Sequence, residues 1–262
     1  MDLSNIKMVV TDMDGTLLNS NHEVSDRFFK LFEELRKRKI HFVAASGRQY
    51  HSMVDKLNSI KNDVLFIAEN GAIIKNKGDN LLSTPLNKEH LNRILNTVSK
   101  LQDVHPVLCA SNKAYVNGSS KKFIQLLKEY YTQFEIVENL SLVADEVLKV
   151  AIYHFENSEE FIYPSVKDLE GILKVKVSGS NWVDISHLNA HKGYALKKVM
   201  KEYNISSNEL LVFGDYNNDI EMLSLSDYSF AMANAHPNVK KVAKYETASN
   251  NAFGVEKILE LL

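Results

Sequence analysis

Cysteine is almost absent from this chain, since Cys109 is the only one among 262 residues. An internal disulfide is therefore impossible, which favours a reducing compartment, and we expect a cytoplasmic protein. Cys109 lies in the apolar segment Pro106–Ala110, and no Cys–His signature surrounds it. We interpret it as a small buried side chain and not as a nucleophile.

Long apolar runs, basic clusters and proline- or glycine-rich linkers are missing as well. No segment approaches the roughly 20 apolar residues that cross a membrane, and the first residues lack the basic start and apolar stretch of a signal peptide. The 31 basic and 33 acidic residues are spread along the chain, with a net charge of −2, so no basic stripe favours nucleic acid. We expect a soluble protein without a membrane or nucleic-acid partner, in which an anionic substrate needs local positive charge such as a metal ion.

The most informative segment is Asp12–Leu17, which follows the apolar run Ile6–Val10 directly. The apolar run predicts a buried strand, and open α/β sheets bind ligands at the carboxyl ends of their strands. Two carboxylates, a glycine and a threonine at such an end indicate a site. Asp-Gly is also an ordinary turn dipeptide, so these six residues alone leave a plain turn open.

The first eighty residues alternate between predicted strands and helices. Ser25 is a candidate helix N-cap, and apolar residues at helical spacing follow it up to a basic end at residues 36–39. Further strands are expected at His41–Ala45 and Val64–Ala68, with a helix from about His51 to Ile60 between them. This alternation predicts a parallel, doubly wound sheet whose strands all end in polar, glycine-containing loops at one edge.

The pattern changes after residue 82. From residue 83 to 186, predicted helices alternate with short strand pairs such as Val107–Ser111 against Ala114–Asn117, and the carboxylate and glycine loops are missing. The earlier pattern returns from Lys192, with a strand at Leu210–Phe213. We therefore expect an α/β fold: a doubly wound parallel-sheet (Rossmann-like) core domain formed by residues 1–82 and 187–262, and an inserted α+β domain at residues 83–186.

Loops at this sheet edge gather acidic residues from both ends of the chain. The residues expected there are Asp12, Asp14, Ser46, Asp215 and Asp219, with Lys192 at the start of a helix. Several carboxylates in one cleft repel one another unless a cation is present, and an all-oxygen site suits Mg²⁺ better than zinc. Magnesium binds one or two carboxylates together with phosphate oxygens, so a small-molecule phosphate ester is the natural ligand.

An aspartate can attack phosphorus to form an aspartyl phosphate, which splits one difficult displacement into two, and Asp12 is our candidate for this nucleophile. Asp14 lies on the same side of an extended chain, where it can protonate the leaving oxygen and then take a proton from the attacking water. The metal and Lys192 would offset the negative charge of the phosphoryl group. Hydrogen bonds to its oxygens can come from Ser46, Asn218 and the backbone amides of Met13 and Gly47.

Four segments resemble, in order and spacing, the four motifs of the haloacid dehalogenase-like (HAD) phosphatases: Asp12–Leu17, Ser46–Arg48, Lys192–Gly193 and Gly214–Asp219. The large insertion is similar to the C2-type cap of the Cof-like sugar-phosphate phosphatases, and Glu69–Ala72 also resembles a segment of that subfamily. The resemblance implies a Mg²⁺-dependent phosphatase of small phosphorylated metabolites, sugar phosphates above all, whose cap closes over the substrate and sets specificity.

Carried over residue by residue, the resemblance makes Asp12 the nucleophile and Asp14 the acid/base. The metal ligands it implies are Asp12, the main-chain carbonyl of Asp14 and Asp215, with Asp219 a further metal partner through water. The phosphate-binding residues it implies are Met13 through its amide, Ser46, Gly47, Lys192 and Asn218. Tyr216 departs from the family pattern, because many relatives have a small residue there, and we expect it to change the pocket wall.

Several of these residues also have plain structural interpretations. Ser46 alone could cap a helix, and Lys192 alone could be a solvated lysine at a helix end. Arg48, Glu69 and Asn70 are candidates for substrate contact, although Arg48 and Glu69 could instead form ion pairs at the domain junction.

His187 and His191 are four residues apart and could face a metal together. Without an intervening glutamate or a third ligand, we expect surface or hinge histidines instead.

Two other functions stay open at this stage. A phosphomutase or phosphotransferase would use the same aspartyl phosphate but return the phosphoryl group to a sugar. A non-catalytic module would receive a phosphoryl group as a signal, although receiver domains are shorter and lack an inserted cap. An ATPase would need a Gly-x-x-x-x-Gly-Lys-Ser/Thr loop, which is missing. We expect a monomer, because the cap already shields the sheet edge.

Overall fold

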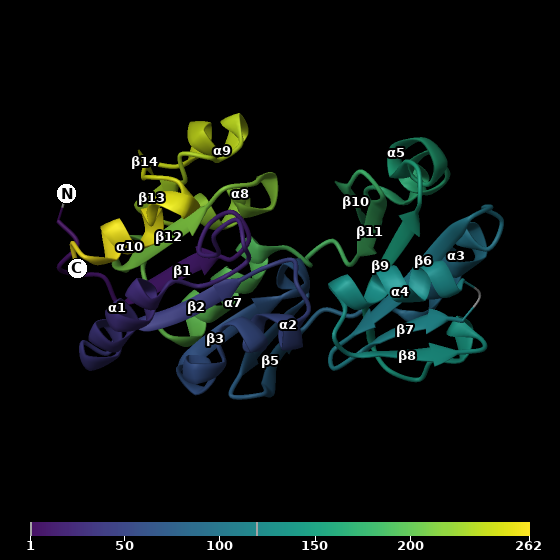
Figure 1. Ribbon diagram of the computed structural model, residues 1–262, viewed down its shortest axis with the longest axis horizontal. Helices are drawn as coiled ribbons and strands as arrows, with labels where there is room; N and C mark the ends of the chain where they lie inside the picture. The colour runs from purple at the N-terminus through teal and green to yellow at the C-terminus, as the bar shows by residue number, and fades with distance from the viewer. Residues whose placement is uncertain (1, 119) are drawn as a thin grey trace. The chain divides into compact units, whose positions relative to one another are not determined.

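Apolar segments from both ends of the sequence join in one sheet of eight strands in the computed structural model, which describes residues 2–118 and 120–262 (Figure 1). Its order is β14-β13-β12-β1-β2-β3-β4-β5. The strands are β1 (Met8–Asp12), β2 (His41–Ala45), β3 (Val64–Ala68), β4 (Ile73–Asn76), β5 (Asp79–Ser83), β12 (Leu210–Gly214), β13 (Tyr228–Ala231) and β14 (Tyr245–Glu246). From β14 to β3 neighbouring strands are parallel, and β4 pairs with β3 antiparallel. The predicted parallel sheet is confirmed, with an antiparallel extension at one edge.

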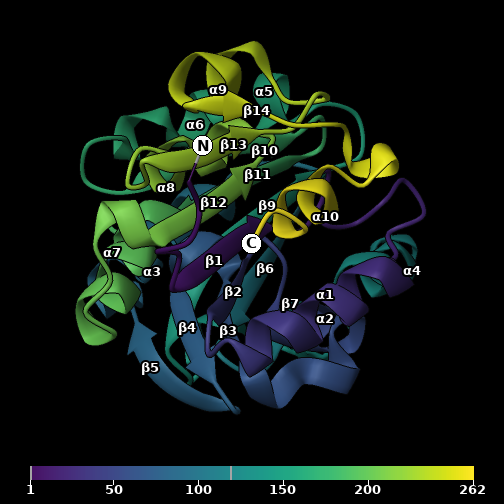
Figure 2. The ribbon, with the colours of Figure 1, turned by 90° about the vertical axis from the view of Figure 1, so that its left-hand side faces the viewer.

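Helices lie on both faces of this sheet. Figure 2 shows α7 on one side and α1 and α10 on the other. The helices of this part are α1 (Asp26–Lys37), α2 (Tyr50–Lys56), α7 (Lys192–Glu202), α8 (Ile220–Leu223), α9 (Pro237–Val242) and α10 (Gly254–Leu259). Every residue of β1, β3 and β12 is buried, which explains why these strands are continuous apolar runs and not alternating ones. The doubly wound fold class is therefore confirmed.

The first helix begins and packs as its sequence predicts. The Ser25 hydroxyl accepts a hydrogen bond from the Phe28 amide at 3.0 Å, which caps the helix and confirms the predicted N-cap. Phe28 and Phe32 are buried and pack against Phe42 of β2, with ring centroids 5.2 and 5.6 Å apart. These rings fix α1 to the sheet.

The helix expected from about His51 to Ile60 is shorter than predicted. α2 ends at Lys56, and a 3₁₀ helix follows over Asn58–Asp63. Asparagine and serine have low helix propensities, because their side chains can compete for backbone hydrogen bonds, and this disfavours a helix interior at Asn58 and Ser59.

Residues 83–190 form a second sheet of mixed direction, in the order β10-β11-β9-β6-β7-β8. Its pairs are antiparallel except for β7 and β8. The strands are β6 (Val104–Ala110), β7 (Ala114–Asn117), β8 (Phe134–Val137), β9 (Val147–His154), β10 (Lys174–Gly179) and β11 (Trp182–Ser186), and the helices are α3 (Lys88–Val98), α4 (Lys121–Tyr130), α5 (Ser158–Phe161) and α6 (Tyr163–Val166). The expected pairing of residues 107–111 with 114–117 is present.

The chain divides into two compact units, which we call the core unit and the insert unit. The core unit contains the chain up to Arg48 together with Met53–Leu82 and His191–Leu262, and the insert unit contains Gln49–Ser52 and Ser83–Ala190. Residues 49–52 and 187–190 were expected in the core domain, whereas they belong to the insert unit. Within the insert unit, Gln49 Nε2 donates to the backbone carbonyl of Gln133 at 3.4 Å. The assignment of the two parts as catalytic and substrate-selecting domains stays a prediction.

No helix within the described residues is both long and apolar enough to cross a membrane.

The loop that follows β3 is left-handed over three consecutive residues. The φ angles are 48° at Glu69, 56° at Asn70 and 94° at Gly71. A side chain at Gly71 would also collide with the backbone of His191 and Lys192 at the start of α7. Gly71 is therefore required both by its φ angle and by the close approach of a helix.

We expect Gly71→Ala to lower the free energy of unfolding by about 3 kcal/mol or more, because left-handed strain adds to a backbone collision. Gly78 is a matched control, because its φ is 91° and no atom lies within 4 Å of the position of a Cβ. Gly78→Ala should cost only about 1 kcal/mol. Urea denaturation measures both, and equal losses in the two variants would contradict the close packing at Gly71.

Candidate active site

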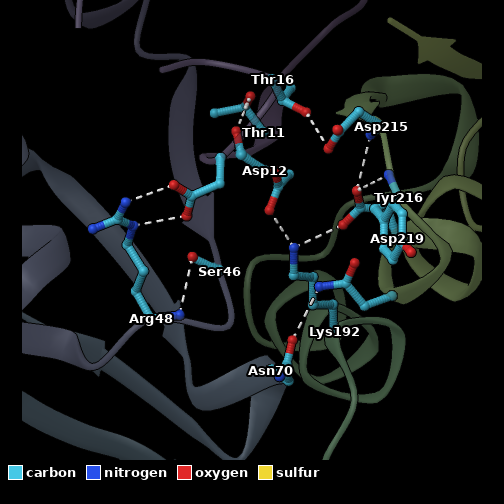
Figure 3. Close-up of polar contacts among 12 residues, drawn as sticks. Thr11, Asp12, Thr16, Ser46, Arg48, Asn70, Lys192, Asp215, Tyr216 and Asp219 are labelled. Atoms are coloured by element: carbon cyan, nitrogen blue, oxygen red, sulfur yellow. Dashed lines mark hydrogen bonds and ion pairs between the residues drawn. The ribbon is translucent and has the colours of Figure 1, made fainter. Parts of the chain in front are cut away.

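The candidate site lies where parallel strands of the core unit end. β1 ends at Asp12, β2 is followed by Ser46, and β12 is followed by Asp215. Because β12, β1 and β2 are adjacent and parallel, their carboxyl ends meet at one edge of the sheet. Figure 3 shows these side chains pointing toward one another, together with Lys192 from the start of α7.

Three carboxylates form the centre of the site. Asp12, Asp215 and Asp219 each offer an oxygen within 4.8 Å of the oxygens of the other two. Asp219 is fully buried and Asp12 is 5% exposed. The convergence predicted from distant parts of the chain is therefore present in the fold.

Lys192 links two of these carboxylates. Its side chain is fully buried, and its Nζ donates to Asp12 Oδ1 and, at 2.7 Å, to Asp219 Oδ1. Burial acts to lower the pKa of Lys192, but the two negative charges outweigh burial and raise this pKa above its usual value. Lys192 is thus a buried cation, and the alternative of a solvated lysine at a helix end is wrong.

One lysine does not balance three carboxylates. Burial raises the pKa of Asp12 well above its usual range, with the charge of Lys192 acting against the shift. Burial, followed by the charge of Asp219, raises the pKa of Asp215 to about 6. A buried group of oxygen donors with excess negative charge fits a hard divalent cation such as Mg²⁺, which these three residues would hold.

Backbone and side-chain donors fix the two acids that follow β12. Asp219 Oδ2 accepts from the amides of Asp215 and Tyr216 at 3.0 and 3.1 Å. The Thr16 hydroxyl donates to Asp215 Oδ1 at 3.2 Å, and a side chain at Gly15 would collide with the Asp215 carboxylate. The loop after β1 therefore packs directly on Asp215.

Asp14 is paired with Arg48. The guanidinium donates to both carboxylate oxygens, from Nε at 2.7 Å and from Nη2 at 2.6 Å. Burial acts to raise the pKa of Asp14, but the hydrogen bonds and charge of Arg48 outweigh burial and lower this pKa below its usual value. Arg48 thus forms an ion pair with Asp14 within the core unit, and contact of Arg48 with the substrate stays a prediction.

The other predicted phosphate-binding residues lie in the segments that follow the central strands. Ser46 is buried, and its hydroxyl accepts from the Arg48 amide at 3.1 Å, so it does not cap α2, which begins at Tyr50. Asn218 Nδ2 donates to Asn70 Oδ1 at 3.0 Å. The side chain of Met13 is fully buried in the core, which leaves only its backbone for a ligand. The roles of these residues stay predictions.

Three further residues that the sequence predicts at the site, Glu69, Gly47 and Tyr216, differ from one another in exposure and contacts. Glu69 is 3% exposed, and Gly47 lies against the amide of Asn70. Tyr216 is 53% exposed and packs edge-on against the His236 ring at 5.7 Å, and its effect on the pocket wall stays a prediction.

His187 and His191 each accept a hydrogen bond from a nearby backbone amide. His191 Nδ1 accepts from the Tyr194 amide and caps α7, while His187 Nδ1 accepts from the Asn189 amide. Neither belongs to the acidic group that could hold a metal among the described residues. The sequence-based preference for a structural role agrees with these contacts.

Sequence reasoning missed two side chains at the site. Thr16 contacts Asp215, and its place in the Asp12–Leu17 segment could have indicated such a role. His22 Nδ1 lies 3.4 Å from Asp14 Oδ1, and no sequence signal pointed to it.

Comparisons with known proteins agree with this geometry. A family model described as haloacid dehalogenase-like hydrolase matches residues 9–259. The chain is 30% identical over 261 residues to the 5-amino-6-(5-phospho-D-ribitylamino)uracil phosphatase YbjI of Escherichia coli, which covers 97% of this chain and 95% of that protein. It is 24% identical over 256 residues to YcsE of Bacillus subtilis, a phosphatase with the same substrate in its name, at 97% and 94% coverage. The crystal structure of SMU.1108c from Streptococcus mutans is 32% identical, with a TM-score of 0.86 and coverage of 97% and 98%.

A family match over nearly the whole chain, on a fold with acids at the predicted strand ends, defines the class: the chain belongs to the haloacid dehalogenase-like hydrolases. Within that family it is a Cof-like phosphatase, a hydrolase of phosphoric monoesters, as its named relatives are. The resemblance identified from the motifs is confirmed. The non-catalytic phospho-acceptor module is set aside, because the relatives are named as enzymes.

The raised pKa values predict how metal binding depends on pH. Without a metal, the folded protein holds a proton on Asp215 up to about pH 6, and Asp12 shifts in the same direction, so a cation must displace protons to bind. We expect Mg²⁺ affinity to weaken by about tenfold or more for each pH unit below 6, since at least one proton is displaced. Isothermal titration calorimetry at pH 5.0, 6.0 and 7.5 measures this, with Asp215→Asn expected to lose most of the affinity. Equal affinity at all three pH values would contradict the raised pKa.

Proposed function

We propose that this protein is a Mg²⁺-dependent phosphatase of small phosphorylated metabolites, with Asp12 as the nucleophile that carries the phosphoryl group. The observation that supports this most is the placement of Asp12. It is buried, ends a central strand, and shares one site with Asp215, Asp219 and a buried lysine. A metal bound to these acids would supply charge stabilisation for the phosphoryl oxygens.

In the first half of the proposed reaction, a carboxylate oxygen of Asp12 attacks phosphorus and the bond to the ester oxygen breaks. The Asp14 carboxyl group gives its proton to the leaving oxygen, which departs as an alcohol. Lys192, Ser46 and Asn218 are the side chains that we assign to the phosphoryl oxygens. The product bound to the enzyme is an aspartyl phosphate.

In the second half, the Asp14 carboxylate takes a proton from a water molecule that attacks the same phosphorus. The bond to Asp12 breaks, inorganic phosphate leaves, and both aspartates return to their starting states. The ion pair with Arg48 favours the ionised Asp14 that this half needs. For the first half we expect the substrate dianion to compete for the guanidinium, so that Asp14 can hold a proton.

Two conservative substitutions separate the proposed roles. Asp12→Asn should reduce turnover of p-nitrophenyl phosphate to background, because the nucleophile is lost. Asp14→Asn should lower steady-state turnover by about 10²- to 10⁴-fold yet still release one equivalent of p-nitrophenolate, because this leaving group needs no acid. Rapid-mixing kinetics and mass spectrometry of the trapped phosphoenzyme measure both results.

Asp168→Asn, at an exposed acid of the insert unit, is the control and should leave turnover unchanged. Near-normal phosphate release by Asp12→Asn would rule out the covalent route. Full activity of the wild-type protein in excess chelator would remove the metal from the proposal.

The substrate we propose is a phosphate ester of a sugar or polyol chain. The relatives YbjI and YcsE carry 5-amino-6-(5-phospho-D-ribitylamino)uracil in their names, a compound with a phosphorylated ribityl chain. It is therefore the first compound to test. A cytoplasmic location, a monomeric state and the absence of nucleic-acid partners stay predictions.

We expect this compound and the pentose, hexose and polyol phosphates to be hydrolysed with a kcat/KM about tenfold or more above that of nucleotides, because the compound in the names of YbjI and YcsE has its phosphate on a ribityl chain. A colorimetric assay of inorganic phosphate over a panel that includes pyridoxal phosphate measures this. Preference for nucleotides would contradict the proposed class. Conversion of one sugar phosphate into another without phosphate release would favour the phosphomutase alternative.

A further inference from the structure

The left-handed loop Glu69–Gly71 lies among the residues that we assign to phosphate binding. Three consecutive left-handed residues are an unusual conformation, and for Glu69 and Asn70 it is a strained one. Such conformations persist where the surroundings fix them, and they often occur at functional sites. The question is what this conformation positions.

The backbone of the loop holds the segment that follows β2. The Asn70 amide donates to the Ser46 carbonyl at 2.9 Å, and the Glu69 amide donates to the Arg48 carbonyl at 3.0 Å. On its other side, Gly71 packs against the backbone at the start of α7. The loop therefore joins the Ser46–Arg48 segment to the helix that begins with Lys192.

The side chain of Asn70 joins a third segment. Its Oδ1 accepts from Asn218 Nδ2 at 3.0 Å, as Figure 3 shows at Asn70. A Cβ on Gly47 would lie 3.0 Å from Asn70 Oδ1 and 3.1 Å from Nδ2, so the amide group lies against Gly47. The side chain of Asn70 thus contacts two of the proposed phosphate-binding residues, one from each end of the chain.

This contact decides which end of the Asn218 amide faces Asn70. A side-chain amide has two N–H donors on nitrogen and only lone pairs on oxygen. Because Asn70 Oδ1 accepts one N–H, the amino group of Asn218 faces Asn70 and has a second N–H that can donate to a phosphoryl oxygen. With Asn70 in this orientation, a reversed Asn218 amide would set two amide oxygens against each other.

We propose that Asn70 is a positioning residue, which fixes the Asn218 amide so that it is ready to donate to a phosphate before the phosphate binds. This inference rests on the proposed function, because it takes Asn218 as a phosphate-binding residue. Contact of Asn70 with the substrate itself stays a prediction. Asn70 acts through Asn218, and its effect therefore depends on Asn218.

A double-mutant cycle tests this dependence. Asn70→Gly removes the amide but tolerates the left-handed backbone and keeps the N–H that donates to Ser46. We expect Asn70→Gly and Asn218→Ala each to lower kcat/KM for p-nitrophenyl phosphate about tenfold, and to raise the inhibition constant of inorganic phosphate by a similar factor. The kcat/KM of the double variant should lie within about twofold of the kcat/KM of the less active single variant. Both substitutions remove the same contact, so their effects should not add.

Asn204→Gly is the matched control. Asn204 is also left-handed, with φ at 53°, but it is exposed just beyond α7. This substitution should leave kcat/KM and phosphate inhibition unchanged. Mg²⁺ affinity should stay within about twofold of the wild-type value in all variants, because the acidic cluster is not altered. A general loss of structure at the site would change this affinity.

A second pair of variants, which keeps Asn70 in place, makes the test decisive if Asn70→Gly folds poorly. Gly47→Ala places a methyl group against the Asn70 amide, and it should weaken phosphate inhibition several-fold in the wild-type background. If the Asn70 amide transmits this effect to Asn218, Gly47→Ala should add little in the Asn218→Ala background, where the Asn218 amide is already removed.

Independent effects that multiply in the double variant would overturn the inference, because Asn70 would then act without Asn218. An Asn70→Gly variant whose kcat/KM equals that of the wild-type protein would overturn the inference as well. A wild-type protein without phosphatase activity would instead overturn the proposed function. In that case, calorimetric titration with inorganic phosphate over the same variants would still decide whether Asn70 positions Asn218.

Discussion

The contact of Lys192 with Asp12 and Asp219 is the interaction on which the rest of the site depends. A buried ammonium group is costly unless carboxylates surround it, and buried carboxylates are costly without a cation. This mutual requirement joins the end of β1, the start of α7 and the turn after β12 at one point. The parallel order of the central strands makes that meeting possible, because it brings their carboxyl ends to a single edge.

The charges around this point are arranged in two groups with different character. The buried group of Asp12, Asp215 and Asp219 has more negative charge than Lys192 can balance, which suits a divalent cation. Asp14, only two residues from Asp12, is instead matched by the bidentate guanidinium of Arg48. Burial raises the pKa of Asp12, whereas the hydrogen bonds and charge of Arg48 lower the pKa of Asp14. A cation bound to the acidic group would lower the pKa of Asp12, as the proposed nucleophile requires.

Much of the core fold follows from local pattern. Buried strands such as Val64–Ala68 are continuous apolar runs, and Ser25 caps the first helix as its sequence predicts. The acids at the strand ends could be predicted because parallel strands have few arrangements open to them. The end of α2 was less predictable, because Asn58 and Ser59 shift the balance between helix types by small energies.

The sequence by itself determined which chemical groups the protein has and on which strand ends they lie, because periodicity and motif spacing are local properties. Only the tertiary structure decided their partners. It paired Asp14 with Arg48, buried Lys192 completely, and set Asn70 against Asn218. These outcomes depend on distances of a few ångströms between residues far apart in the chain, and such distances are fixed by packing and not by local sequence.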